Sequence, residues 1–406
     1  MLRGVIHTTV KKILLIIVIT SSVIHYSLET TTLTSLITIS SIVCYSMVSF
    51  FGDKTARGLL INEIGHSPLF WVISLCFLLS QVVITGRGHY ESYNMAKTIG
   101  YIGVFTCTAY LLSVGAYESR TFFWGFIAFI GAVISGMGVL EVLEITDIGL
   151  VKTSGWKVPV IGVRATSSVL LDENYFSMFA TISYLAGVFK VHRSNSVLFK
   201  VWWALIVLIC LGGIVLSYSR TGYLAVLVST IYFIYKSGSK KLAKKFAIAA
   251  VSLGVATSVY LYRTSFYVLF QVERLGTGRI ELVKNGYSLL VQKPIFGWGI
   301  GNVEYALGKA GVSRSSTHNT IVDMGIQAGI LGVFSIIFLI LTTAYRLGAS
   351  QDHEYLNVSV SVLICLFIFS QTITITPGGV GYGSVMTVLV IGQILLISNE
   401  RIVNHG

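Results

Sequence analysis

One histidine near the start of an apolar segment has the residue type and the neighbours that proton transfer requires. His318 and Asn319 directly precede this segment, and Asp323 follows about one helical turn later. A histidine with a pKa near neutrality can accept or donate a proton at such an interface. The alternative is a histidine that only caps a helix. The sequence alone leaves both roles open.

A second group that could do chemistry is Arg279, which follows Gly278 at the expected start of a helix. From Gly278 to Leu290 the apolar residues recur close to the helical period, which predicts an amphipathic helix on or near a membrane surface. A helix N-terminus beside an arginine is a good phosphate site. Equally, Arg279 and Glu281 can be ordinary solvated charges.

The segment after this helix, Lys293–Asn302, combines a proline with three alternating glycines. Pro294 ends the helix. The segment lacks the G-x-G-x-x-G spacing and the preceding strand of a nucleotide fingerprint, so we reject that function. Two interpretations remain: a tight connector, or a loop whose backbone amides face a diphosphate.

A third candidate, Arg220, lies in the only polar break of an otherwise apolar stretch, Val201–Tyr235. As one helix these residues would span about 52 Å, against a hydrocarbon core of about 30 Å. The chain must therefore turn at Ser217–Gly222. An arginine in apolar surroundings costs about 2.5 to 3.5 kcal/mol, so Arg220 faces a functional site unless the turn lifts it to the lipid headgroups.

The elements that position these residues are predicted to be membrane helices. Hydrophobic residues make up 54% of the 406 residues and charged residues only 11%, far below the share of a soluble protein. The sequence predicts an all-α polytopic protein with a single integral membrane domain over 1–406. Twelve segments qualify as spans: Ile13–Leu28, Leu33–Phe51, Leu69–Thr85, Thr98–Val114, Phe122–Val142, Tyr175–Val191, Val201–Tyr218, Thr221–Tyr235, Phe246–Tyr262, Thr320–Thr343, Leu356–Thr374 and Gly383–Ser398.

Basic clusters on both sides of Val201–Tyr235 orient the chain, because short cytoplasmic loops collect Lys and Arg. Both termini are then cytoplasmic, and the two long outer loops are 143–174 and 263–319. The net charge of +12 is expected for such a protein and predicts no nucleic-acid partner. However, the outer loop 263–319 holds seven basic residues against three glutamates, an excess that the charge rule does not explain.

These segments together resemble the O-antigen ligase / O-antigen polymerase (Wzy-type) superfamily of bacterial membrane glycosyltransferases. The resemblance covers roughly 164–332, and the twelve-span layout fits the whole chain. Four blocks carry it: Arg164 with Asp172-Glu173-Asn174-Tyr175; Ser219-Arg220-Thr221-Gly222; Gly278-Arg279 with Lys293-Pro294-Ile295-Phe296-Gly297-Trp298-Gly299; and His318-Asn319 with Asp323, Gly325 and Gly329.

The resemblance implies a GT-C-like fold in the bacterial inner membrane, with an active site that faces the periplasm. The donor would be a glycan on undecaprenyl diphosphate. Arg220 and Arg279 match the family's two essential arginines and His318 its essential histidine, as catalytic residues. Arg164, Asn174, Lys293, Asn319 and Asp323 are the candidates for binding the diphosphate or the glycan. No metal and no cofactor are expected, since the outer segments lack a carboxylate cluster with Mg²⁺ spacing.

Two activities fit this resemblance and differ in the acceptor. A polymerase joins repeat units of O-antigen, capsule or exopolysaccharide, and we favour it slightly; a ligase transfers finished polymer to lipid A-core in lipopolysaccharide synthesis. Membrane lipids and, for a polymerase, a chain-length regulator are the further expected partners. A transporter or flippase is a more distant alternative, because transporters place ionisable residues near mid-bilayer, whereas here they lie in loops and at span ends.

Overall fold

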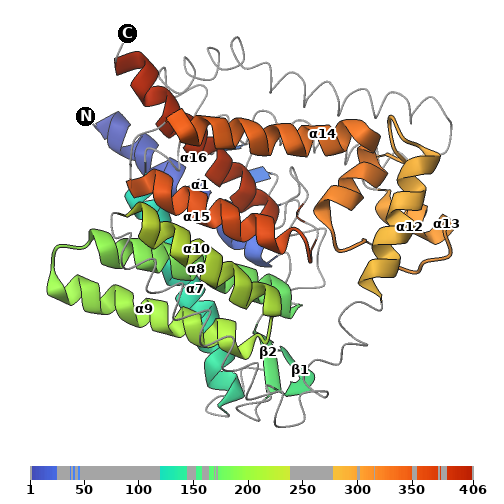
Figure 1. Cartoon of the computed structure of the whole chain (residues 1–406). Coiled ribbons are helices and arrows are strands. Elements are labelled where there is room, and N and C mark those ends of the chain that lie inside the picture. The colour runs from blue at the N-terminus through green and yellow to red at the C-terminus, as the bar shows by residue number, and fades with distance from the viewer. Residues whose placement is uncertain are drawn as a thin grey trace. The chain divides into compact units, whose positions relative to one another are not determined.

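The computed structural model describes residues 2–24, 37, 40–41, 44–45, 119–143, 152–157, 164–168, 170, 172–237, 278–299, 302–314, 316–349, 354–373, 375 and 382–404. These residues are mostly helical (Figure 1). The predicted spans Leu69–Thr85, Thr98–Val114 and Phe246–Tyr262 lie outside the described residues, as does most of Leu33–Phe51. The chain divides into two compact units, which are treated separately below.

One unit comprises Trp124–Leu282 and Asp352–Thr372. Its elements are most of α7 (Arg120–Val142), β1 (Lys152–Lys157), β2 (Arg164–Ser168), α8 (Glu173–Arg193), α9 (Val197–Leu216), α10 (Arg220–Lys236) and α15 (Glu354–Phe369). Helix α8 is central, because α9, α10 and α15 all pack against it and it is buried over most of its length. A helix that is apolar on every side must be surrounded in this way.

Helices α7 and α9 are each long and apolar enough to cross a membrane. No other helix among the described residues meets both conditions. Side chains of α9 such as Leu198, Leu205 and Leu208 are 76%, 50% and 62% exposed. In water such a surface would be costly, whereas lipid accepts it. The apolar helices therefore support a membrane protein.

The turn predicted inside the apolar stretch Val201–Tyr235 is confirmed. Helix α9 ends at Leu216 and α10 begins at Arg220. Within the turn, the Ser217 hydroxyl donates to the Ile214 carbonyl at 2.7 Å, and Tyr218 adopts a left-handed φ of 51°. The two helices are therefore separate elements, and the arginine lies at the junction.

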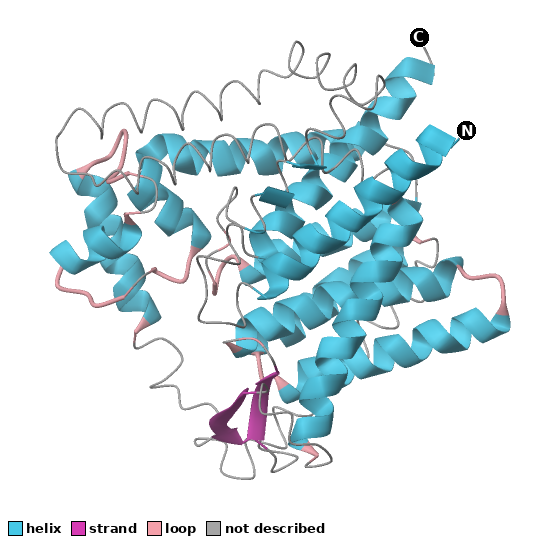
Figure 2. Ribbon diagram, turned by 180° about the vertical axis from the view of Figure 1, so that it is seen from behind, coloured by secondary structure: helices cyan, strands magenta, loops and turns pink. Residues whose placement is uncertain are grey.

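The first predicted outer loop, 143–174, contains an antiparallel pair of strands that the sequence did not predict (magenta in Figure 2). Lys152, Thr153 and Lys157 pair with Ser168, Thr166 and Arg164. The Ser168 hydroxyl donates to the Ile134 carbonyl of α7 at 2.7 Å. The fold of the described residues is therefore helical with one small strand pair, rather than purely helical.

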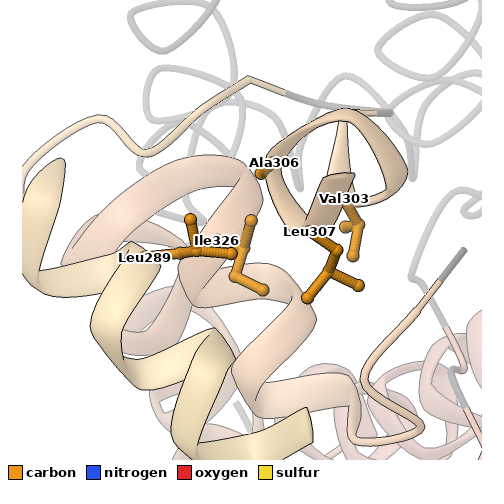
Figure 3. Packing of buried hydrophobic residues seen from close by; sticks show 5 residues of the cluster. All are labelled: Leu289, Val303, Ala306, Leu307 and Ile326. Carbon is orange, nitrogen blue, oxygen red and sulfur yellow. The ribbon is translucent and has the colours of Figure 1, made fainter. Parts of the chain in front are cut away.

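The other unit comprises Met1–Phe123, Val283–Gln351 and Ile373–Gly406. Its described elements are α1 (Leu2–Ile24), most of α12 (Arg279–Gln292), α13 (Val303–Lys309), α14 (Thr320–Ala349) and α16 (Tyr382–Asn404). Helix α16 packs against α1 and α14. Helices α12, α13 and α14 share a small apolar core (Figure 3), made of Leu289, Val303, Ala306, Leu307 and Ile326.

Helix α14 is broken at Gly329, so the prediction of one continuous helix over Thr320–Thr343 is wrong. Gly329 has φ 65° and ψ −155°, a conformation open almost only to glycine. The helix changes direction there (Figure 1). The break leaves backbone donors and acceptors on either side without helical partners.

The segment Lys293–Gly299 supplies those partners. The Trp298 amide donates to the Ile326 carbonyl at 2.6 Å and the Gly299 amide to the Gln327 carbonyl at 2.8 Å; on the far side of the break, the Ile330 amide donates to the Pro294 carbonyl at 2.7 Å. Backbone groups buried away from water must be paired. This segment and the broken helix therefore form one hydrogen-bonded junction.

We expect Gly329→Ala to destabilise the protein. A Cβ there would lie 2.6 Å from the Pro294 carbonyl oxygen and nearer still to that of Ile295. The backbone conformation alone costs about 1–3 kcal/mol for a residue with a side chain. The free energy of unfolding of the detergent-purified protein would fall by at least that amount. The matched control is Gly308→Ala, where a Cβ meets nothing within 4 Å; equal stability of the two variants would contradict the expectation.

Candidate functional site

Arg220 is the first residue of α10, and its position is set by its neighbours. The Ser219 hydroxyl accepts a hydrogen bond from the Gly222 amide at 3.3 Å and so caps the helix. Gly222 is buried against α8, and a Cβ on it would overlap the Ser177 hydroxyl. Serine and glycine therefore fix the start of α10, and the exposed Arg220 lies in its first turn.

Ser219 also joins the start of α10 to the start of α8. Its hydroxyl donates to Asn174 Oδ1 at 2.8 Å, across 45 residues of sequence. The Asp172 carboxylate caps α8 by accepting from the amides of Asn174 and Tyr175, at 2.7 and 3.3 Å. Two of the predicted site residues, Asn174 and Arg220, are thus brought together, with Ser219 between them.

The backbone of Arg164 lies in β2, opposite Lys157 of β1. Strand β2 packs against α8 and α9. Arg164 therefore belongs to the same unit as Asn174 and Arg220, while its side chain lies outside the described residues, as does that of Arg279 at the start of α12.

In the other unit, Asp323 holds the chain just before α14. One carboxylate oxygen, Oδ1, accepts from the Thr317 amide at 2.9 Å and from the Thr317 hydroxyl at 2.6 Å. Asp323 is 0% exposed and Thr317 only 1% exposed. This carboxylate is therefore committed to the protein, and its geometry suits a positioning residue better than a ligand-binding one.

Asn319, and not His318, caps α14. Asn319 Oδ1 accepts from the Val322 amide at 3.1 Å, the bond expected of a cap residue three positions earlier. The interpretation of His318 as the cap is therefore wrong. Polar residues before an apolar segment correctly predicted that a helix starts here. The sequence alone did not show which of these residues makes the capping bond.

His318 itself has a left-handed backbone, with φ 57°. This conformation is uncommon for residues other than glycine, and strained residues of this kind cluster at functional sites. The His318 amide donates to the Ser316 hydroxyl at 3.2 Å, and the bonds of Thr317 and Asn319 hold the chain on both sides. The partly exposed histidine is thus held in one backbone conformation.

Helix α12 packs directly against this histidine segment. A Cβ on Gly286 would lie 3.0 Å from the Thr317 side chain and would overlap that of Val322. Only glycine allows so close an approach. The helix that begins with Arg279 is therefore in contact with the residues flanking His318.

The described part of the glycine-rich segment, Lys293–Gly299, is a tight connector; Ile300 and Gly301 lie outside the described residues. The amides of Gly297, Trp298 and Gly299 donate to the carbonyls of Lys293, Ile326 and Gln327, so they do not face a diphosphate. The ammonium of Lys293 lies 4.0 Å from the centre of the Trp298 ring, a cation–π contact. The Trp298 indole N–H donates to the Leu289 carbonyl at 2.9 Å. Lys293 is half-buried, and its ammonium lies against this ring.

Sequence reasoning missed Ser219, Ser316 and Thr317 as residues that position the site. For Ser219 a signal was present, because serine directly before an apolar helical segment indicates a cap. For Ser316 and Thr317 the contacts depend on the left-handed backbone at His318, which has no signature in the sequence.

We expect Asp323→Ala to loosen the histidine segment. The variant removes the acceptor of the buried Thr317 amide and the shorter bond of the Thr317 hydroxyl, which also donates to the Asn319 carbonyl at 3.3 Å. We expect a cost of about 1–3 kcal/mol, measured by unfolding of the purified protein. Reaction of His318 with diethyl pyrocarbonate, read by mass spectrometry, should become faster. The control Thr317→Val keeps the amide bond to Asp323 and removes only the hydroxyl with its bonds, so it should cost less, about 0.5–1.5 kcal/mol. An Asp323→Ala protein as stable as the control would contradict this assignment.

Comparison with known proteins finds one family similarity, over part of the chain. Residues 205–337 match the family model described as O-antigen ligase. No curated protein matches the chain. The matched range includes Arg220, Arg279 and His318, whereas Arg164 and Asn174 precede it. The match supports the resemblance of this part of the chain to the O-antigen ligase / O-antigen polymerase superfamily.

Proposed function

We propose that the protein is a membrane glycosyltransferase. It transfers a glycan from an undecaprenyl-diphosphate-linked donor to a sugar hydroxyl at the outer face of the cytoplasmic membrane. The active site faces the periplasm, and both termini are cytoplasmic. One observation carries the proposal: within the family-matched range, Arg220 and Arg279 each begin a helix, and His318 lies two residues before another.

Helix starts suit the chemistry of this reaction. The acceptor hydroxyl attacks the anomeric carbon, the bond from that carbon to the diphosphate oxygen breaks, and undecaprenyl diphosphate leaves with the electron pair. Negative charge grows on the diphosphate, and the positive end of a helix dipole with an arginine beside it stabilises that charge. Arg220 and Arg279 are assigned this role.

His318 is assigned to the acceptor hydroxyl. It accepts the hydroxyl proton or orients the hydroxyl for attack, and either role needs an imidazole at a fixed position. The bonds of Asp323 and Asn319 supply that fixed position. Asp323 and Asn319 are therefore positioning residues in this proposal, although the resemblance had suggested that they bind substrate.

The remaining candidates are assigned to the bound donor. Asn174 is tied to the start of α10 through Ser219, so it lies close to the backbone that carries Arg220. Arg164 belongs to the same unit, and Lys293 contributes positive charge in the outer loop. We propose that these three residues bind the diphosphate or the first sugars.

The polymerase activity is the one we propose, with repeat units of O-antigen, capsule or exopolysaccharide as acceptors. Ligation of finished polymer to lipid A-core is the second candidate, favoured by the description of the matched family as O-antigen ligase. The two activities share the donor and the diphosphate leaving group. They differ in the acceptor alone.

We expect Arg220→Ala and Arg279→Ala each to lower turnover about 100- to 1,000-fold, the usual effect of removing one group that stabilises developing charge. The assay uses purified protein, undecaprenyl-diphosphate glycan and an acceptor. Arg314→Ala, an exposed arginine elsewhere in the outer loop, serves as the control and should keep its turnover. Retained turnover in both test variants would refute the assignment of the arginines. The proposal requires no metal, so EDTA should not change the rate.

The glycan profile of a deletion strain should separate the two activities. Loss of a polymerase leaves lipopolysaccharide with a single repeat unit, because ligation continues. Loss of a ligase leaves polymer on undecaprenyl diphosphate. We expect the first profile, and the second would replace the polymerase assignment by the ligase.

A further inference from the structure

Helix α12 has two apolar faces rather than the one predicted. Leu282 and Leu289 are 8% and 1% exposed, and Gly286 lies on the same side, in contact with α14. A second row lies on another side of the helix and is uncovered: Ile280, Tyr287 and Val291 are 60%, 66% and 59% exposed. The exposed Lys284 falls in the same row.

A third, polar row lies about 100° around the helix from the uncovered one. It consists of Glu281, Ser288 and Gln292, all exposed. Because polar and apolar exposed residues are separated, the uncovered apolar row is a distinct surface. Hereafter it is called the outer row, defined as Ile280, Tyr287 and Val291 together with Lys284.

The outer row leads toward a second exposed apolar surface. Beyond the end of α12, Ile295 is 55% exposed. The Ile330 amide bonds to the Pro294 carbonyl, so the backbone on the far side of the break in α14 adjoins this point. From there Ile330, Phe334, Ile337 and Leu341 are 47%, 59%, 41% and 60% exposed, at helical spacing along α14.

This continuity indicates what covers the outer row. The row along α14 belongs to a predicted span, where exposed aliphatic side chains face hydrocarbon. The outer row differs by including Lys284 and the phenol of Tyr287, side chains that suit the border between hydrocarbon and lipid headgroups. An apolar protein partner would leave the ammonium of Lys284 buried and unpaired, whereas lipid phosphate neutralises it.

We propose that the outer row of α12 lies in the lipid–water interface of the membrane, with Lys284 among the lipid phosphates. Helix α12 then rests between lipid on one side and α13 and α14 on the other. Arg279, its first residue, is held at about the depth of the phosphates. This surface is an interaction with lipid and does not depend on glycosyl transfer by the protein.

The test measures lipid contact directly, without any donor substrate. In a chain whose five cysteines are replaced by alanine, single cysteines at Tyr287 and Val291 carry an environment-sensitive fluorophore, and the protein is reconstituted into phosphatidylglycerol–phosphatidylcholine vesicles. Matched controls are Ser288→Cys and Gln292→Cys on the polar row of the same helix. Quenchers are nitroxide lipids labelled near the headgroup and aqueous iodide.

We expect the lipid nitroxide to quench the probes at 287 and 291 at least threefold more than those at 288 and 292, with iodide giving the opposite order. Equal quenching of the two rows by lipid would overturn the proposal. So would strong protection from both quenchers together with disulfide cross-linking of two chains through Cys at 287, since that pattern indicates a second copy. Neither readout depends on turnover, so this inference and the glycosyltransferase proposal can fail separately.

Discussion

The requirement that buried backbone groups be paired governs the part of the molecule around the candidate histidine. Helix α14 cannot continue through Gly329, and the amides and carbonyls at the break are paired with Lys293–Gly299 instead. This pairing fixes α12, which ends just before that segment, against the first part of α14. The contact between Gly286 and the residues flanking His318 follows from it. The position of His318, just before α14, therefore depends on the break at Gly329 further along the same helix.

Asn174, Arg220 and His318 lie at or just before the start of a helix, beside residues that cap it. Asp172 caps α8, Ser219 caps α10, and Asn319 caps α14. The amides at a helix start need acceptors in any case, so such polar side chains serve stability and position at once. Additional bonds tie these caps to other segments, as Ser219 does with Asn174. Within each unit, a residue at a capped helix start is consequently held in place beside the positive end of the helix dipole.

The sequence predicted the elements well where composition decides them. The bounds of α7, α8 and α10, and the turn before Arg220, follow from apolar length and a single polar interruption, whereas α15 ends at Phe369, before the predicted Thr374. The break at Gly329 was not predicted, because hydropathy carries no information about backbone dihedral angles. Gly329 also lies among apolar residues that are typical of a continuous helix. The pair β1–β2 was missed because its stability depends on a partner strand and on α7, neither visible in a local pattern.

In the candidate site, too, contacts between side chains that are distant in the sequence could not be predicted from local patterns. Arg220 and Asn174 were identified as separate blocks, whereas their connection through Ser219 spans 45 residues and appears only in the fold. The periodicity of α12 identified its apolar residues correctly but could not divide them between two faces. That division depends on which side Gly286 allows α14 to approach.

The junction at Gly297 and Gly329 also has a consequence for the length of the chain. Consecutive amides of Trp298 and Gly299 meet consecutive carbonyls of Ile326 and Gln327, so inserting or deleting one residue between Lys293 and Gly299 would shift every bond out of register. The stretch from Ala310 to Arg314 is exposed over most of its length, and its described backbone bonds run only to the adjacent end of α13 and within the stretch itself. Variation in loop length among related chains should therefore collect in the latter stretch, while the former keeps a fixed number of residues.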